Sequence, residues 1–199
     1  GTALVASARL GAACTMFSFL SHDEVGARVA SELVAEGIGI KGVAAIPRGT
    51  SPSSFIHVDS QSGERTIFHR PAEGLERAAL PDFSLIAESD VLLVDDYYPE
   101  LALAAARMAR RNGVPVVADL TISLSKCPDL FRETSVLIAP RAYAAQIGFA
   151  DDYSRALQAI RRLGPETAMI TLGREGYVYS SPEGSGRGRA FKVPVADTT

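Results

Sequence analysis

Blocks of apolar and polar residues follow one another along the chain in a way that predicts helices and strands in turn. Residues 2–10 carry apolar side chains at helical spacing and end at Gly11, which suits the end of a helix. Residues 14–20 form a continuous apolar run of strand length. We expect a second amphipathic helix from Val25 to Glu36, with Asp23 as its N-cap.

The segment from residue 91 to residue 172 repeats an order of strand and helix. The apolar runs predict strands at 91–94, 114–119, 136–139 and 168–172, and helices at 99–111 and 154–163. Strands and helices that alternate in this way are typical of a parallel sheet covered by helices on both faces.

Two further segments predict antiparallel hairpins. Residues 54–59 and 65–70 alternate in the manner of strands and predict a hairpin with one polar face. Residues 177–180 and 190–193 predict a second hairpin, whose strands are joined by the Gly/Ser-rich link 182–188.

Composition indicates an ordinary globular protein. The chain has 199 residues, of which 47% are hydrophobic and 22% charged, and we expect one α/β domain over residues 1–199. The formal net charge of -3 gives no electrostatic footprint for nucleic acid or an anionic membrane. No apolar run approaches the roughly 20 residues that span a bilayer. We therefore expect a cytoplasmic protein with neither nucleic-acid nor membrane partners.

Cysteines and histidines form no recognisable site. Cys14 and Cys127 lie far apart and outside any C-x-x-C pair, so they indicate neither a disulfide framework nor a zinc site. His57 and His69 lack acidic or thiol partners at ligand spacing, and His22 has only sequence neighbours, which do not make a catalytic triad. A dinucleotide enzyme is disfavoured because no G-x-G-x-x-G turn joins a strand to a helix.

The candidate chemistry lies where the predicted strands end. Open α/β sheets bind ligands beyond the carboxyl ends of their strands. The polar residues at those ends are Asp23, Asp95, Asp96, Asp119 and Thr171. The carboxylates of Asp95, Asp96 and Asp119 have the chemistry to bind hydroxyl groups, although each residue taken singly is better explained as a helix cap or a loop residue.

The segment Thr171-Leu172-Gly173-Arg174-Glu175-Gly176 follows a predicted strand with two glycines. Glycines permit a tight turn and a close approach of backbone N–H groups to phosphate. A simple hairpin turn would need the same residues, so the segment is informative only in a wider context.

That context is a resemblance to the ribokinase-like (PfkB) family of sugar kinases, and within this family the chain is most similar to its ketohexokinase-like and other divergent members. The similar segments are Ala8-Arg9-Leu10-Gly11, Asp23-Glu24-Val25-Gly26, Gly63-Glu64-Arg65-Thr66, Thr171 to Gly176, and Val195-Ala196-Asp197-Thr198-Thr199. The resemblance covers nearly all of the chain. It implies a three-layer α/β/α fold with a mostly parallel central sheet and a small β lid, to which the hairpin at residues 50–70 would belong.

The resemblance also implies an activity, namely transfer of the γ-phosphoryl group of ATP, with Mg, to a hydroxyl of a sugar or sugar-like alcohol. The expected partner is a small-molecule sugar or nucleoside, and a homodimer through the β lid is expected as well. The implied substrate-binding residues are Gly1, Thr2, Asp23, Asp95 and Asp119. The implied nucleotide-binding residues are Arg141, Thr171, Gly173, Gly176, Thr198 and Thr199.

Several positions depart from the family pattern. The sugar-binding asparagine of the family falls at Thr2, and Ser21 and His22 stand where Gly and Asp are usual. The Asn-x-x-Glu motif falls at Arg141 to Ala144 and leaves no carboxylate there, as in ketohexokinase-like members. These departures motivate an alternative, a noncatalytic sugar- or nucleotide-binding relative with the same fold.

The two ends of the sequence also enter the prediction. Both ends look cut, and the family's Gly-Ala-Gly-Asp turn, which carries the catalytic aspartate, is expected beyond Thr199. No catalytic base and no metal ligand can therefore be assigned within residues 1–199. On this interpretation the 199-residue chain alone would not catalyse the transfer.

Overall fold

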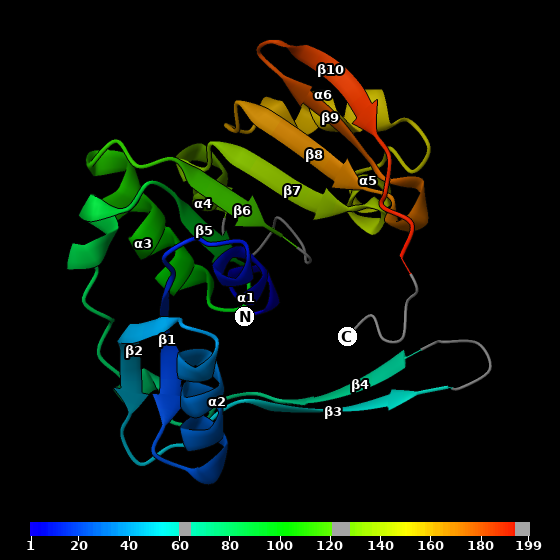
Figure 1. Cartoon of the computed structure of the whole chain (residues 1–199). Helices are drawn as coiled ribbons and strands as arrows, with labels where there is room; N and C mark the ends of the chain where they lie inside the picture. Colours follow the sequence, from blue (N-terminus) through cyan, green and yellow to red (C-terminus); the bar gives the residue numbers. More distant parts are fainter. Residues whose placement is uncertain (60–64, 121–127, 194–199) are drawn as a thin grey trace. The chain divides into compact units, whose positions relative to one another are not determined.

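The computed structural model describes residues 1–59, 65–120 and 128–193, which form two compact units, Gly1–Phe83 and Ser84–Thr199 (Figure 1). Each unit is an α/β structure. The single domain over residues 1–199 stays a prediction. Among the described helices, none has the length and apolar character needed to cross a membrane.

The first unit is built on a parallel strand pair with a helix beside it. Its elements are α1 (Thr2–Arg9), β1 (Thr15–Ser21), α2 (Glu24–Ala35), β2 (Gly39–Ile46), β3 (Ser53–Val58), β4 (Arg65–Arg70) and the 3₁₀ helix η1 (Leu75–Arg77). The predicted N-cap of α2 is confirmed, because Asp23 Oδ1 accepts a hydrogen bond of 2.8 Å from the Gly26 N–H. Beyond the helix, Gly37 adopts a φ of 74°, a left-handed conformation that suits glycine.

The predicted hairpin is confirmed as the antiparallel pair β3–β4, which extends away from β1, β2 and α2 within this unit (Figure 1). Phe55 lies opposite Phe68 and Ile56 lies opposite Ile67. Because successive residues of a strand point to opposite faces, each face carries one apolar pair. The expectation of one polar face is therefore wrong, and all four side chains are exposed.

The second unit contains a six-stranded sheet in the order β10-β9-β8-β7-β6-β5 (Figure 1). Its elements are η2 (Ser84–Glu88), β5 (Leu92–Asp95), α3 (Pro99–Arg111), β6 (Val116–Asp119), α4 (Pro128–Glu133), β7 (Val136–Pro140), α5 (Arg141–Gln146), α6 (Tyr153–Arg161), β8 (Thr167–Thr171), η4 (Gly173–Glu175), β9 (Tyr177–Ser181) and β10 (Gly184–Gly188). Strands β5 to β8 are parallel, as the sequence predicts, whereas β9 and β10 run antiparallel.

The second hairpin differs from its prediction. Its second strand is β10, which lies in the segment expected to be a link, and residues 190–193 form no strand. In β10 the glycines face tyrosine rings: a Cβ on Gly188 would lie 2.2 Å from the Tyr177 ring, and one on Gly186 2.9 Å from the Tyr179 ring. The glycines therefore make room for the two tyrosines of β9 rather than loosening the chain.

Alternating small and branched side chains form the core of the second unit. Alternate residues of the inner strands are fully buried, at 0% exposure: Val116, Ala118, Leu137, Ala139, Ala168 and Ile170. Helix α3 covers β5 and β6 with a stripe of alanines, and α6 packs on β8 and β9 with Leu157 and Ile160. Short alanine side chains allow a helix to approach the sheet closely.

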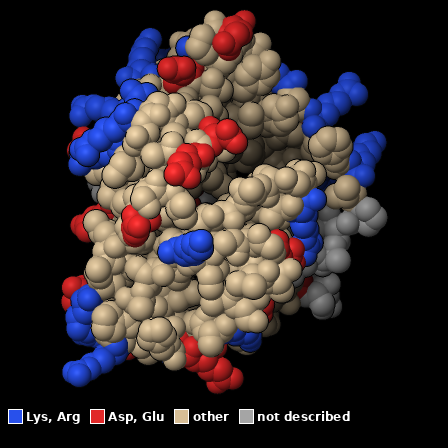
Figure 2. Space-filling view, turned by 60° about the vertical axis from the view of Figure 1, so that its left-hand side comes forward, with Lys and Arg blue, Asp and Glu red and all other residues tan. Residues whose placement is uncertain are grey.

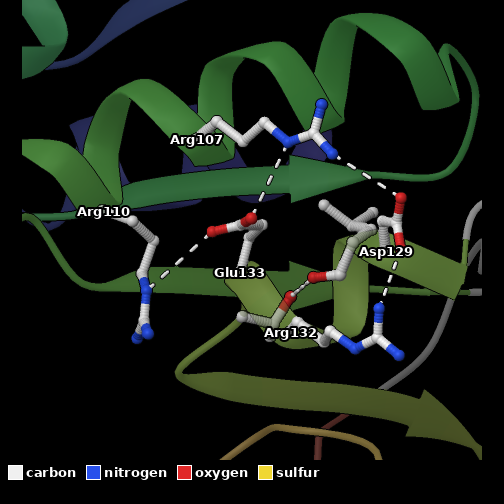
Figure 3. Close-up of polar contacts among 7 residues, drawn as sticks. Arg107, Arg110, Asp129, Arg132 and Glu133 are labelled. Atoms are coloured by element: carbon white, nitrogen blue, oxygen red, sulfur yellow. Dashed lines mark hydrogen bonds and ion pairs between the residues drawn. The ribbon is translucent and has the colours of Figure 1, made fainter.

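Charged residues connect α3 and α4 on the outside of this unit (Figure 3). Glu133 lies between two arginines, 3.7 Å from Arg107 and 4.0 Å from Arg110, while Asp129 pairs with Arg107 at 3.5 Å and with Arg132 at 3.2 Å. Exposed ion pairs of this kind contribute only about 0–1 kcal/mol each. Helix α4 is therefore held chiefly by its two buried apolar residues, Leu130 and Phe131.

Candidate functional site

The parallel strands of the second unit bring most of the predicted site residues to one edge of the sheet. In the observed register Asp95 on β5 lies beside Asp119 on β6, and Pro140 on β7 lies beside Thr171 on β8. Arg141 directly follows β7 as the first residue of α5. Acidic residues thus end β5 and β6, whereas a basic residue and a glycine turn follow β7 and β8.

The acidic part of the edge contains a carboxyl group that is costly to ionise. Burial raises the pKa of Asp119, and the nearby carboxylates of Asp95 and Asp96 raise this pKa further. Burial and the charge of Asp95 likewise raise the pKa of Tyr98. A ligand that brings hydroxyl donors or positive charge to Asp119 would stabilise its ionised form.

The basic part of the edge is a cluster of three side chains. The Arg141 guanidinium forms an ion pair with Glu175 Oε1, and its Nη2 also donates to the Leu172 carbonyl at 3.3 Å. Arg187 on β10 approaches the other oxygen of the same carboxylate, Oε2, at 3.3 Å. The hydrogen bond from Arg141 lowers the pKa of Glu175, so that the carboxylate is ionised.

The turn after β8 depends on both of its glycines. Gly173 and Gly176 have φ values of 60° and 92°, in the left-handed region. The turn is closed by the Leu172 N–H, which donates to the Gly176 carbonyl at 2.7 Å. A Cβ on Gly176 would lie 2.0 Å from the Gly188 carbonyl oxygen, whereas one on Gly173 would meet nothing within 4 Å. Glycine at 176 thus permits packing against the end of β10, and glycine at 173 leaves the backbone uncovered.

In the first unit, the predicted site residue Asp23 is engaged by the protein itself. Its Oδ1 accepts from Ser51 Oγ at 2.6 Å, in addition to the Gly26 N–H, and its Oδ2 accepts from the Ser51 N–H at 2.8 Å. These hydrogen bonds, those from Ser51 first, lower the pKa of Asp23. Its carboxylate therefore fixes the loop at Ser51 to the start of α2, and a contact with substrate stays a prediction.

The other predicted residues are distributed as follows. Gly1 and Thr2 are exposed at the start of α1, where Gly1 is the N-cap without a side-chain hydrogen bond. Thr198 and Thr199 lie outside the described residues, as do Gly63 and Glu64. Within the described parts of the chain, no three His, Cys, Asp or Glu side chains gather as a metal site.

Sequence reasoning missed two residues of these clusters. Ser51 is fully buried beside Asp23, but it is 28 positions away in the chain, and no local pattern marks it. Arg187 lies in the segment that the sequence predicts as a link between strands. The signal that was available is its place in a Gly-x-Gly-x-Gly run after the turn residues Pro182 and Glu183, which is compatible with the second strand of a tight hairpin.

Acidic and basic side chains are interspersed over the face drawn in Figure 2, so neither sign of charge dominates that face.

Comparisons with known proteins give one consistent family. A model of the pfkB family carbohydrate kinases matches residues 2–199. Aminoimidazole riboside kinase of Salmonella typhimurium is 24% identical over 212 residues, which cover 98% of this chain and 66% of that protein. The chain thus spans just under two thirds of the length of this curated relative.

Solved structures show the same fold. Ribokinase from Thermotoga maritima superposes with a TM-score of 0.79 at 22% identity, over 98% of this chain and 66% of that one. Aminoimidazole riboside kinase from Salmonella enterica, solved with aminoimidazole riboside and an ATP analog, gives a TM-score of 0.71 at 21% identity, over 98% and 68% of the two chains. These similarities confirm the predicted ribokinase-like fold class.

Proposed function

Because this chain belongs to the PfkB family of carbohydrate kinases, we propose that the protein transfers the γ-phosphoryl group of ATP to a hydroxyl of a sugar or sugar-like alcohol. The observation that carries the proposal is the division of one sheet edge into an acidic part at Asp95 and Asp119 and a basic part at Arg141. Carboxylates accept hydrogen bonds from hydroxyl groups, and guanidinium groups bind phosphates.

On this proposal the nucleotide phosphates bind at the turn after β8. Arg141 supplies a guanidinium that keeps its charge, and Gly173 leaves the backbone of the turn open to a ligand. The Thr171 hydroxyl group is proposed to contribute to nucleotide binding, and Gly176 is proposed to maintain the geometry of the turn. Thr198 and Thr199 complete the proposed nucleotide-binding set.

The acceptor sugar or nucleoside is proposed to bind through Asp95 and Asp119, at the sheet edge of the second unit. A role in substrate binding for Gly1, Thr2 and Asp23, which belong to the first unit, stays a prediction. A bound hydroxyl donor would stabilise the ionised carboxylate of Asp119, because it would offset the burial and the like charges that raise the pKa of this residue. The ketohexokinase-like character proposed for the protein rests on Arg141, which stands where other family members have the asparagine of Asn-x-x-Glu.

Magnesium is proposed to arrive with ATP and to neutralise charge on its phosphates. By family resemblance, the base that removes the hydroxyl proton is the aspartate of a Gly-Ala-Gly-Asp turn, and no described residue is assigned to this role. We also propose a homodimer that forms through β3–β4, where Phe55 and Phe68 are exposed. A cytoplasmic location belongs to the same proposal.

The proposal is tested with the protein as its gene encodes it, including any residues that flank positions 1 and 199. ADP release is measured with MgATP and a panel of hexoses, pentoses and ribosides, aminoimidazole riboside among them. We expect transfer to at least one compound and a loss of at least tenfold in kcat/KM for Asp119→Asn. The control is Glu166→Gln, which also replaces a carboxylate by an amide. Glu166 is exposed and lies just before the first residue of β8, away from the edge that carries the proposed site. A folded protein that phosphorylates none of the panel would contradict the proposal.

The alternative is a noncatalytic sugar- or nucleotide-binding relative. It is favoured by the engagement of Asp23 with Ser51 and by the missing carboxylate at residues 141–144. Such a protein would gain thermal stability from a sugar or a nucleotide without releasing ADP. The thermal-shift and ADP measurements on one sample therefore separate the two functions.

A further inference from the structure

We infer that Glu175 is an internal counter-anion, which occupies Arg141 and Arg187 until a polyphosphate displaces it. The inference rests on the proposed nucleotide site and deepens it. It assigns Arg187 to the same site and gives Glu175 a role in setting the affinity of that site for phosphate groups.

The contacts of Glu175 are those a bound phosphate would make. Its two carboxylate oxygens are divided between two guanidinium groups, Oε1 at Arg141 and Oε2 at Arg187. Phosphate oxygens bind guanidinium groups through the same kind of charge-assisted hydrogen bond. Carboxylate and phosphate therefore compete for the same N–H groups.

The ion pairs are weak enough to be exchanged. The side chains of Arg141, Glu175 and Arg187 are 48%, 51% and 58% exposed, respectively. Exposed pairs hold little net energy because water and salt screen them. The two arginines also come from different elements, α5 and β10, so each can turn toward a ligand independently of the other.

The backbone around the cluster keeps the arginines near the turn when Glu175 leaves. Arg141 retains its hydrogen bond to the Leu172 carbonyl. The end of β10 is fixed against the turn because Gly176 and the Gly188 carbonyl are packed closely. Without the charge of Glu175 the cluster has a charge of +2 rather than +1, so its attraction for a polyanion increases.

The inference is tested by calorimetry, which measures the binding of inorganic tripolyphosphate and of ATP to the full protein at 50 mM and 200 mM salt. We expect Glu175→Gln and Glu175→Ala each to increase the affinity for tripolyphosphate and for ATP by about fivefold at low salt, and by less at high salt. Arg187→Gln is expected to weaken both by a similar factor. Glu166→Gln, which removes the same charge from the far end of β8, should change neither by more than about twofold.

A purely structural salt bridge would give the opposite result. Loss of Glu175 would then loosen the turn and leave anion affinity unchanged or weaker, and this outcome overturns the inference. Phosphoryl transfer is measured on the same proteins. Tighter tripolyphosphate binding in a protein that transfers no phosphoryl group would support the inference and contradict the proposed function. Phosphoryl transfer without any increase in anion affinity in the Glu175 variants would support the proposed function and contradict the inference.

Discussion

Asp23 and Ser51 are 28 positions apart in the chain, yet two hydrogen bonds join them: Ser51 donates from Oγ to Oδ1 at 2.6 Å and from its backbone N–H to Oδ2 at 2.8 Å. Ser51 Oγ also accepts from the Ser21 N–H at 2.9 Å. The end of β1, the start of α2 and the chain before β3 are thereby held together by one carboxylate and one hydroxyl.

We expect Asp23→Asn to lower the melting temperature of the protein by several degrees near neutral pH. The amide group cannot accept from the Ser51 N–H and Oγ at the same time as from Gly26. The folded-state pKa of Asp23 is lowered, so its contribution is complete above the unfolded-state pKa of about 4 and is lost as the pH falls through the folded-state value. The difference between the two proteins should therefore shrink in acid, and thermal melts from pH 7 to pH 3 measure it. An unchanged difference at pH 3 would contradict this linkage.

We expect Gly26→Ala to destabilise the first unit by about 1–3 kcal/mol or more. A Cβ at this position would lie 2.1 Å from the Ser21 carbonyl oxygen and 2.6 Å from Ser51 Oγ, so α2 must move away from β1. Urea unfolding measures the change. Ser31→Ala, at an exposed position of the same helix, is the matched control, and it should be neutral or slightly stabilising because alanine favours helix.

We expect Asp119→Asn to stabilise the fold at neutral pH while it impairs activity. The folded-state pKa of Asp119 is raised, so the wild-type protein loses stability as the pH rises from about 4 through that raised value. The asparagine variant has no such loss. Chemical denaturation at pH 7.5 and pH 3.5 should show a higher free energy of unfolding for the variant than for the wild type only at pH 7.5. A variant that is less stable than the wild type at both pH values would refute the assignment.

We expect Tyr143→Phe to leave the free energy of unfolding unchanged or to raise it by up to about 1 kcal/mol. Tyr143 is 1% exposed, and within the described part of the chain its hydroxyl has no hydrogen-bond partner. Tyr143→Ala removes the ring as well and should cost about 3–5 kcal/mol. Denaturant unfolding of the two variants separates the roles of hydroxyl and ring, and a clear loss in the phenylalanine variant would reveal a partner for the hydroxyl.

Local signals were enough to predict much of the fold. Helix α3 has the predicted bounds, because Pro99 is compatible with its first turn and Asn112-Gly113 with its end. Asp23 was predicted as an N-cap from its place before an apolar periodicity. The residues of β5, β6 and β8 were found from short apolar runs, because strands buried on both faces are apolar throughout.

The elements that were missed depend on contacts distant in sequence. Strand β2 contains Gly42, where a Cβ would lie 2.5 Å from the Phe17 ring on β1, so the glycine that obscures the strand pattern is explained only by its neighbour. The same holds for the glycines of β10. The site shows the same division: Arg141 and the glycine turn were identified from motif positions, whereas Ser51 and Arg187 join their clusters through loop closure and strand pairing.

The β3–β4 ribbon has a consequence for the behaviour of the protein in concentrated solution. Two-stranded ribbons are marginally stable by themselves, and this one leaves Phe55 and Phe68 60% or more exposed. Such a ribbon opens in a local fluctuation that leaves the core intact, and its edges can then pair with other chains. Hydrogen exchange and colloidal stability should therefore be governed by this ribbon before the core of either unit contributes.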